Sequence, residues 1–164
     1  MSNRRRLMAA AVADAPGGIR KTPHDLSSDR GKNFVLSAIS SLGDEHPAWY
    51  AMNGNPRAAD GEFHTEFEDH PWWMIAFDRP VELLNIDFQW RTEDYWELGG
   101  TDYLLQYSDD GETFTTVQRF EVGMGFDGPL TVIPVSGGGR HRYWRLLGDF
   151  EDYMIIGELE LTYR

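Results

Sequence analysis

Four side chains near the middle of the chain have the chemistry that a sugar-binding site requires. His64 and Arg91 carry planar polar groups, while Tyr95 and Trp96 lie between acidic residues in the polar loop 92–100. A sugar ring has hydroxyl groups around its edge and one apolar face, so its site needs planar hydrogen-bonding groups and an aromatic platform. A tryptophan is hard to bury in a polar loop that ends in glycine, which favours Trp96 as the platform. These residue types predict a ligand site formed by His64, Arg91, Tyr95 and Trp96.

Each of these residues also has a purely structural interpretation. His64 would then satisfy the backbone of a turn, and Trp96 would fold back as a cover for the core. Arg91 would pair with Glu93 or Asp94, which follow it closely in the sequence. Residue type and spacing leave both interpretations open.

The sequence predicts no catalytic residue. The segment 64–70 holds two histidines and three acids, but it lacks the His-Glu-x-x-His zinc pattern and its predicted context is a loop. Neither a Gly-x-Ser-x-Gly nucleophile elbow nor a P-loop is present. Cysteine is absent, which excludes thiol catalysis and thiolate metal sites. Because the chain has 27 acidic residues, carboxylate pairs of the glycosidase kind arise by chance.

The charge of the chain is unevenly distributed. The formal net charge is −12, but residues 1–32 carry seven of the fifteen basic residues and only three of the 27 acids. The remainder is therefore strongly acidic, and an acidic body repels phosphate backbones and anionic membrane surfaces. No apolar run approaches the roughly 18 residues of a membrane span. We expect no nucleic-acid partner and no membrane insertion, whereas a cation such as calcium would be attracted.

The elements that must position the candidate residues are predicted to be strands. Leu84, Ile86, Phe88 and Trp90 alternate with polar residues, which is the period of a half-buried strand. Similar alternation or denser apolar runs predict further strands at residues 72–77, 103–107, 113–118, 130–135, 143–147 and 159–163. Many short strands separated by turn signals, with weak helical signals, predict an all-β sandwich or jelly roll.

Local features add detail to the predicted sandwich. The Ser-Asp-Asp-Gly sequence at 108–111 is typical of a hairpin turn. Pro134 suggests that its strand lies at an edge or contains a bulge. Trp49 and Trp144 are predicted to belong to the core.

The first 32 residues are predicted to form a basic, flexible tail, and the folded domain is expected to span residues 33–164. The tail contains a Pro-Gly-Gly sequence and a polar run and has no sustained periodicity. Arg4–Arg6 followed by the short apolar stretch Leu7–Ala13 has the outline of a secretory signal. A linker or a disordered basic tail is the alternative interpretation.

Several stretches of the predicted domain carry a resemblance to a known family. They are Asn33–Ser41, Asn53–Pro56, Phe63–Glu66, Pro71–Ile75, Val81–Arg91, Tyr103–Phe114, Tyr143–Arg145 and Gly157–Leu161. In this order they resemble the discoidin, or coagulation factor 5/8 type C, family, which is similar to carbohydrate-binding modules of family 32. Phe63–Glu66 is similar to the Phe/Trp-His-Thr-x-Trp stretch of many members. The resemblance implies a galactose-binding-like jelly roll with its binding loops at one end and no chemistry of its own.

The resemblance also implies a structural calcium ion. Members of the family commonly hold calcium near an Asp-Gly loop that is closed by a glutamate on the last strand, and Glu158 matches that glutamate. Asn53 stands where the aspartate is usual, and Asn55 follows it, so that the site loses one charge. Asp60 would compensate if its loop folds back. The alternative is an Asn-Gly turn that is held by side-chain amides.

These observations predict a non-catalytic carbohydrate-binding module that recognises a glycan through its loops. The alternative is a protein–protein interaction or assembly module on the same fold, which would pair with a partner domain or with a second copy of the chain. Its motivation is an exposed aromatic loop together with a basic tail on an acidic body. The resemblance favours an extracellular or cell-surface location.

Overall fold

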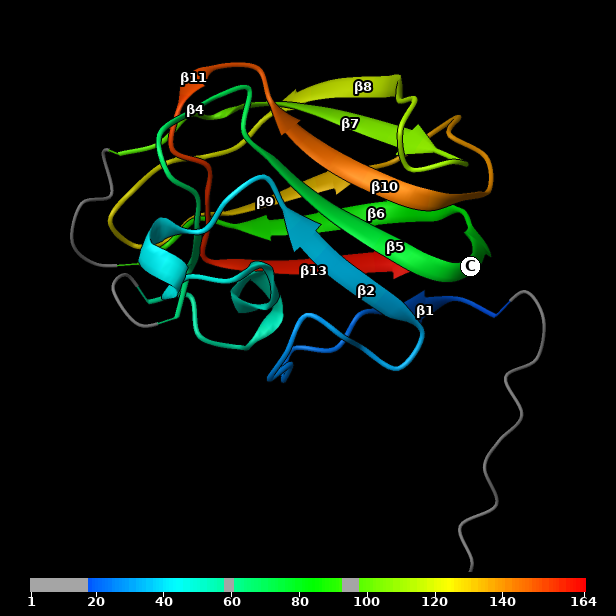
Figure 1. The fold of residues 1–164 in the computed structure, drawn as a ribbon, viewed down its shortest axis with the longest axis horizontal. Coiled ribbons are helices and arrows are strands. Elements are labelled where there is room, and N and C mark those ends of the chain that lie inside the picture. Colours follow the sequence, from blue (N-terminus) through cyan, green and yellow to red (C-terminus); the bar gives the residue numbers. More distant parts are fainter. Residues whose placement is uncertain (1–17, 58–60, 93–97) are drawn as a thin grey trace, which may run out of the picture.

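The computed structural model describes residues 18–57, 61–92 and 98–164, which form two antiparallel sheets packed face to face (Figure 1). The five-stranded sheet consists, in spatial order, of β2 (Phe34–Ala38), β5 (Trp72–Val81), β10 (His141–Gly148), β7 (Asp102–Ser108) and β8 (Thr115–Glu121). The four-stranded sheet consists of β1 (Arg20–Lys21), β13 (Glu158–Tyr163), β6 (Leu83–Gln89) and β9 (Leu130–Pro134). This arrangement confirms the predicted all-β sandwich.

The shorter elements gather at one end of the sandwich, on the left in Figure 1. They are the pair β4 (Glu68–Asp69) and β11 (Glu151–Asp152), the pair β3 (Phe63–His64) and β12 (Ile155–Ile156), and the 3-10 helices η1 (Leu42–Asp44) and η2 (Ala48–Met52). We call the part of this region formed by residues 39–47, 61–70, 91–92 and 149–156 the loop end; η2 lies next to it. No helix in the described ranges is long and apolar enough to cross a membrane.

The core lies between the two sheets, where the alternation seen in the sequence turns one side of each strand inward. Leu159 pairs with Phe88 and Leu161 pairs with Ile86 across β13 and β6, and all four side chains are buried. Such pairs remove a continuous apolar surface from water, which is the main driving force of folding. Trp144 is 1% exposed, as predicted. Trp49, the second tryptophan predicted to belong to the core, is only partly buried and packs against the core from its margin.

The hairpin turn between β7 and β8 is wider than the sequence predicted. The return strand begins at Thr115, because Asp110 Oδ1 accepts hydrogen bonds of 2.8 Å from the backbone N–H groups of both Glu112 and Thr113. These two residues are therefore held in the turn and cannot pair with β7. The edge position that Pro134 suggested for its strand is confirmed, since β9 is the last strand of its sheet.

The described part of the predicted tail is packed against the sandwich. β1 pairs with β13, so the expected start at residue 33 falls after a strand that already belongs to a sheet. Thr22 is buried, and its N–H donates to Leu161 O at 3.0 Å while its Oγ1 accepts from Leu161 N at 2.9 Å. A strand of two residues is too short to show periodicity, so it cannot be recognised from the sequence pattern. Residues 1–17 lie outside the described ranges.

Candidate functional site

The two main sheets and the short strand β3 bring His64 and Arg91 together at the loop end. His64 lies on β3, which pairs with β12 through the partners Ile155 and Ile156. Arg91 follows the end of β6 and is buried. Its charge is close enough to lower the pKa of His64. The fold therefore places these two predicted ligand residues in one region.

Arg91 is held by a buried ion pair with a residue that the sequence did not single out. Its Nη1 lies 3.0 Å from Glu62 Oε1, and the two side chains are only 3% and 2% exposed. Glu93 and Asp94, the partners considered from the sequence, lie outside the described residues. The backbone of Arg91 is also tightly enclosed by Gly157. A Cβ added to Gly157 would lie 2.8 Å from both the N and the Cα of Arg91. Arg91 is thus a fixed, buried group that organises the loop end.

His64 is also buried, at 6% exposure, and it is tied to the backbone of the next residue. Its Nδ1 lies 2.7 Å from Thr65 O, so the Nδ1–H form donates this bond and leaves Nε2 as an acceptor. Burial lowers the pKa of His64 to about 4, and the nearby charges of Arg91 and His46 act in the same direction. The ring is consequently neutral at neutral pH. This contact supports the turn-backbone interpretation, and ligand contact by His64 remains a prediction.

A row of aromatic rings leads from His64 to the surface. The Tyr153 ring lies 5.0 Å from the His64 ring, and the Phe67 ring meets Tyr153 edge-to-face at 5.6 Å. Phe67 is 55% exposed, which is unusual for a phenylalanine and offers an apolar face to a ligand. We call Phe67, Tyr153 and His64 the aromatic row.

Sequence reasoning missed Glu62, Phe67 and Tyr153. One signal for Phe67 was present, since the family stretch quoted above has an aromatic residue three positions after its histidine. The predicted platform residues Tyr95 and Trp96 lie outside the described residues, as does Asp60 of the predicted cation site. Their roles stay predictions.

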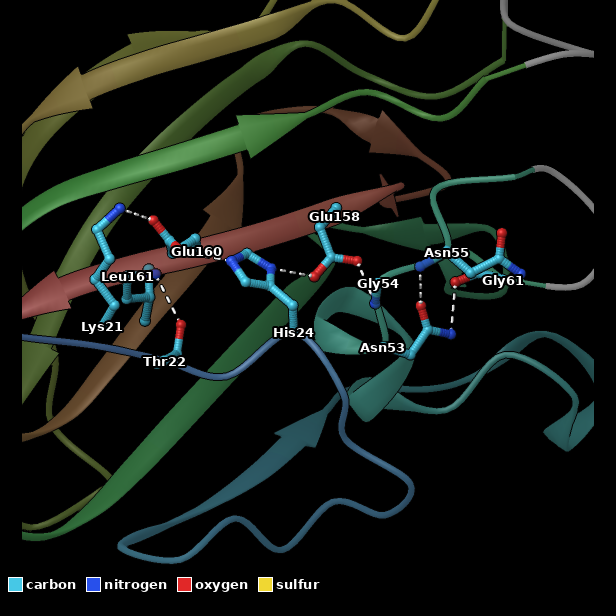
Figure 2. Close-up of polar contacts among 10 residues, drawn as sticks. All are labelled: Lys21, Thr22, His24, Asn53, Gly54, Asn55, Gly61, Glu158, Glu160 and Leu161. Atoms are coloured by element: carbon cyan, nitrogen blue, oxygen red, sulfur yellow. Dashed lines mark hydrogen bonds and ion pairs between the residues drawn. The ribbon is translucent and has the colours of Figure 1, made fainter.

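Three of the four predicted calcium ligands, Asn53, Asn55 and Glu158, lie together near the start of β13, as Figure 2 shows. Glu158 Oε2 accepts a 2.8 Å hydrogen bond from the Gly54 N–H, and Asn53 Oδ1 accepts one of 2.8 Å from the Asn55 N–H. Asn53 Nδ2 donates to Gly61 O at 3.0 Å. These contacts resemble the alternative prediction of a turn held by its own amides. Calcium binding stays a prediction.

His24, from the segment predicted to be a tail, completes this group. Its Nδ1 lies 3.0 Å from Glu158 Oε1, and its Nε2 contacts Glu160. Burial raises the pKa of Glu158 to about 7, although the hydrogen bonds from His24 and Gly54 oppose the rise. Burial by itself would lower the pKa of His24, but its hydrogen bonds to the two carboxylates outweigh this and raise it.

Comparison with known proteins gives the context of this arrangement. A family model described as the F5/8 type C domain matches residues 35–142. The comparison with curated protein sequences gave no match.

Solved structures with the same fold include three domains from bacteria. A family 32 carbohydrate-binding module from Clostridium perfringens, in complex with GalNAc-β-1,3-galactose, is 19% identical with a TM-score of 0.64, covering 79% of this chain and 94% of that chain. The family 32 module of NanJ from the same organism, in complex with galactose, is 17% identical with a TM-score of 0.63, covering 87% and 99%. An F5/8 type C domain from Bacteroides fragilis is 15% identical with a TM-score of 0.68, covering 90% and 97%. These similarities show a galactose-binding-like sandwich.

Proposed function

The chain belongs to the F5/8 type C domain family, and from this premise we propose that it is a non-catalytic module that binds a carbohydrate at the loop end. The aromatic row is the observation that carries the proposal. It combines an exposed apolar ring, Phe67, with a neutral histidine that has an acceptor nitrogen. A sugar needs both, since its ring packs on an aromatic face while its hydroxyl groups require fixed polar partners.

The buried groups behind the row support this function by holding it in place. The Glu62–Arg91 pair lies behind His64, and His46 Nδ1 lies 2.9 Å from the Glu62 carbonyl oxygen. A site whose polar groups are already fixed loses less entropy when it binds a ligand. The solved modules in complex with galactose and with GalNAc-β-1,3-galactose support a terminal or side-chain sugar of the galactose kind as the first ligand to test. Such a module would act where glycans are presented, outside the cell or at its surface.

Replacing Phe67 with Ala is expected to weaken sugar binding about tenfold, because one stacking face worth about 1.4 kcal/mol is lost. Calorimetry with galactose, N-acetylglucosamine and fucose at millimolar concentration measures the change. Ile19→Ala is the matched control, since Ile19 is also an exposed apolar residue but lies next to β1, away from the aromatic row. Equal affinities for the wild-type and Phe67→Ala proteins would remove the aromatic row from the site. Failure of the wild-type protein to bind any of the three sugars would count against carbohydrate binding itself.

An assembly function is the second candidate, and one observation favours it. The edge strand β9 exposes Leu130 and Val132, which are 59% and 56% accessible. An edge strand with exposed apolar side chains is a template for pairing with another chain. Light scattering at high protein concentration distinguishes the candidates, because a monomer in the absence of partners excludes self-assembly.

A further inference from the structure

We propose that His24 takes the place of the structural cation in this protein, joining the carboxylates of Glu158 and Glu160 so that the N-terminal arm, residues 18–26, closes the site without calcium. The cation site of the family brings carboxylates together and needs positive charge to hold them. Here that charge is supplied by the protein's own side chains. The inference is independent of the proposed function, because it makes no use of a sugar.

The three predicted ligands within the described residues, Asn53, Asn55 and Glu158, do not fit a calcium ion as they are placed. Calcium requires about six to eight oxygen ligands with their lone pairs directed at the metal. The described side-chain oxygens face nitrogen atoms instead: Gly54 N and His24 Nδ1 face the two oxygens of Glu158, Asn55 N faces Asn53 Oδ1, and Arg57 N faces Asn55 Oδ1 at 3.3 Å. A nitrogen atom therefore already lies against each of these four oxygens, whereas a calcium ligand needs an oxygen that is free to face the metal. Among the described residues, no group of three or more His, Asp or Glu side chains is arranged to hold a metal ion.

His24 bridges two carboxylates that point out of the same face of β13. Glu158 and Glu160 are two residues apart on one strand, so their side chains lie on the same side of the sheet. The His24 ring lies between them, with one ring nitrogen facing each carboxylate (Figure 2). Carboxylates this close repel each other unless positive charge lies between them. With one nitrogen facing each carboxylate, the ring donates to one of them in either neutral tautomer and to both when it carries two protons.

The surrounding charges are consistent with such a bridge. From β1, Lys21 Nζ pairs with the other oxygen of Glu160. From β6, Asp87 stands opposite Glu160 in the register and adds a third carboxylate. His24, Asp87, Glu158 and Glu160, together with Gln89 and Leu130, line a pocket of about 170 Å³. The basic side chains of the arm thus face an acidic patch formed by the two central strands.

The bridge also connects the arm to the loop that follows η2. The His24 carbonyl oxygen lies so close to Gly54 that a Cβ there would be 2.5 Å away, and Gly54 has a φ of +76°, which glycine adopts without strain. The loop continues to Pro56, whose carbonyl oxygen accepts a 2.8 Å hydrogen bond from the N–H of Thr92, the residue after Arg91. The arm consequently braces a loop that reaches the loop end. The arm thus has the structural role that, from the family resemblance, a calcium ion was expected to have.

Thermal unfolding of the full chain tests the proposal. We expect the melting temperature of the wild-type protein to be the same in excess chelator and in millimolar calcium chloride. His24→Ala should lower it by about 3 °C, and His24→Gln, which keeps a donor, should lower it less. His70→Ala is the matched control, because the His70 side chain is 53% exposed compared with 47% for His24, and in the described residues it contacts Asp69 and Gly148 rather than Glu158 or Glu160.

A double-mutant cycle shows whether His24 acts through Glu158. In a Glu158→Gln background, His24→Ala should have a smaller effect than in the wild-type background, since contacting residues are non-additive. The proposal is overturned if chelator lowers the wild-type melting temperature and calcium restores it, which would establish the calcium prediction instead. It is equally overturned if His24→Ala behaves like His70→Ala, or if the effects of His24→Ala and Glu158→Gln add.

Discussion

Replacing Glu62 with Gln is expected to lower the free energy of unfolding by about 3 kcal/mol, the largest effect of any single substitution considered for this protein. The shape of the side chain is preserved, and the amide oxygen can still accept from Arg91 Nη1. However, the Arg91 guanidinium is almost inaccessible to water and loses the negative charge of Glu62. The cost of a buried charge without its partner exceeds the net value of the pair itself. Urea unfolding of the two proteins measures the difference.

Two further proteins distinguish this effect from simple loss of a contact. Because the cost comes from a buried charge without its partner, a double variant in which Glu62 and Arg91 are both replaced with Met should be more stable than Glu62→Met alone. Arg119→Gln removes two surface pairs, with Asp102 and with Asp149, in which the Arg119 side chain is 58% exposed, and it should cost less than about 1 kcal/mol. A loss for Glu62→Gln no larger than that for Arg119→Gln would contradict the assigned role of the buried pair.

Acidification from pH 7 to pH 4 is expected to destabilise the protein by up to about 3 kcal/mol through His64 alone. Burial and the charges of Arg91 and His46 hold the pKa of His64 at about 4 in the folded protein, below the 6.5 of an exposed histidine. A group with a lowered pKa in the folded state contributes stability that is fully present above the unfolded value of 6.5. That contribution is lost as the pH falls toward 4, because the unfolded chain takes up the proton first.

Carboxylates elsewhere in the chain also respond to acid, so the measurement is a difference between two proteins. Urea unfolding at pH 7 and at pH 4.5 should show a larger loss of stability for the wild-type protein than for His64→Gln, which has no titrating ring. The quantity to compare between the two proteins is the decrease in the free energy of unfolding on acidification, rather than the absolute stability at pH 7. Equal losses in the two proteins would mean that His64 is accessible to protons in the folded state, contrary to its buried position.

The sandwich was predictable because strand formation leaves a local signal. Alternation in residues 84–90 corresponds to β6, and its apolar positions from Ile86 onward face the core. A period of two is a property of neighbouring residues, so the sequence alone is enough to detect it. The family resemblance was equally local, since it depends on short stretches in a fixed order, and the matched family model confirms it over residues 35–142.

The composition of the site was only partly predictable. His64 and Arg91 were identified from their residue types, but their partners were not. Glu62 lies 29 positions before Arg91 in the sequence. The sequence suggested Glu93 and Asp94 because they are adjacent, and these residues lie outside the described ranges; Glu62, which precedes β5 in the chain, had no such local signal. Phe67 had a signal in the family stretch, while Tyr153 reaches His64 only through the pairing of β12 with β3.

By itself, the sequence determined the all-β class, most of the strands, the buried position of Trp144 and the family of the domain. These depend on local periodicity and on short ordered stretches. Only the tertiary structure decided that His24 meets Glu158, 134 positions later, that the segment before residue 33 supplies a strand, and that Arg91 is buried against Glu62. The physical reason is the same in each case: tertiary packing brings together segments that are distant in the chain, and the pattern of neighbouring residues carries no trace of which distant partner a side chain will meet.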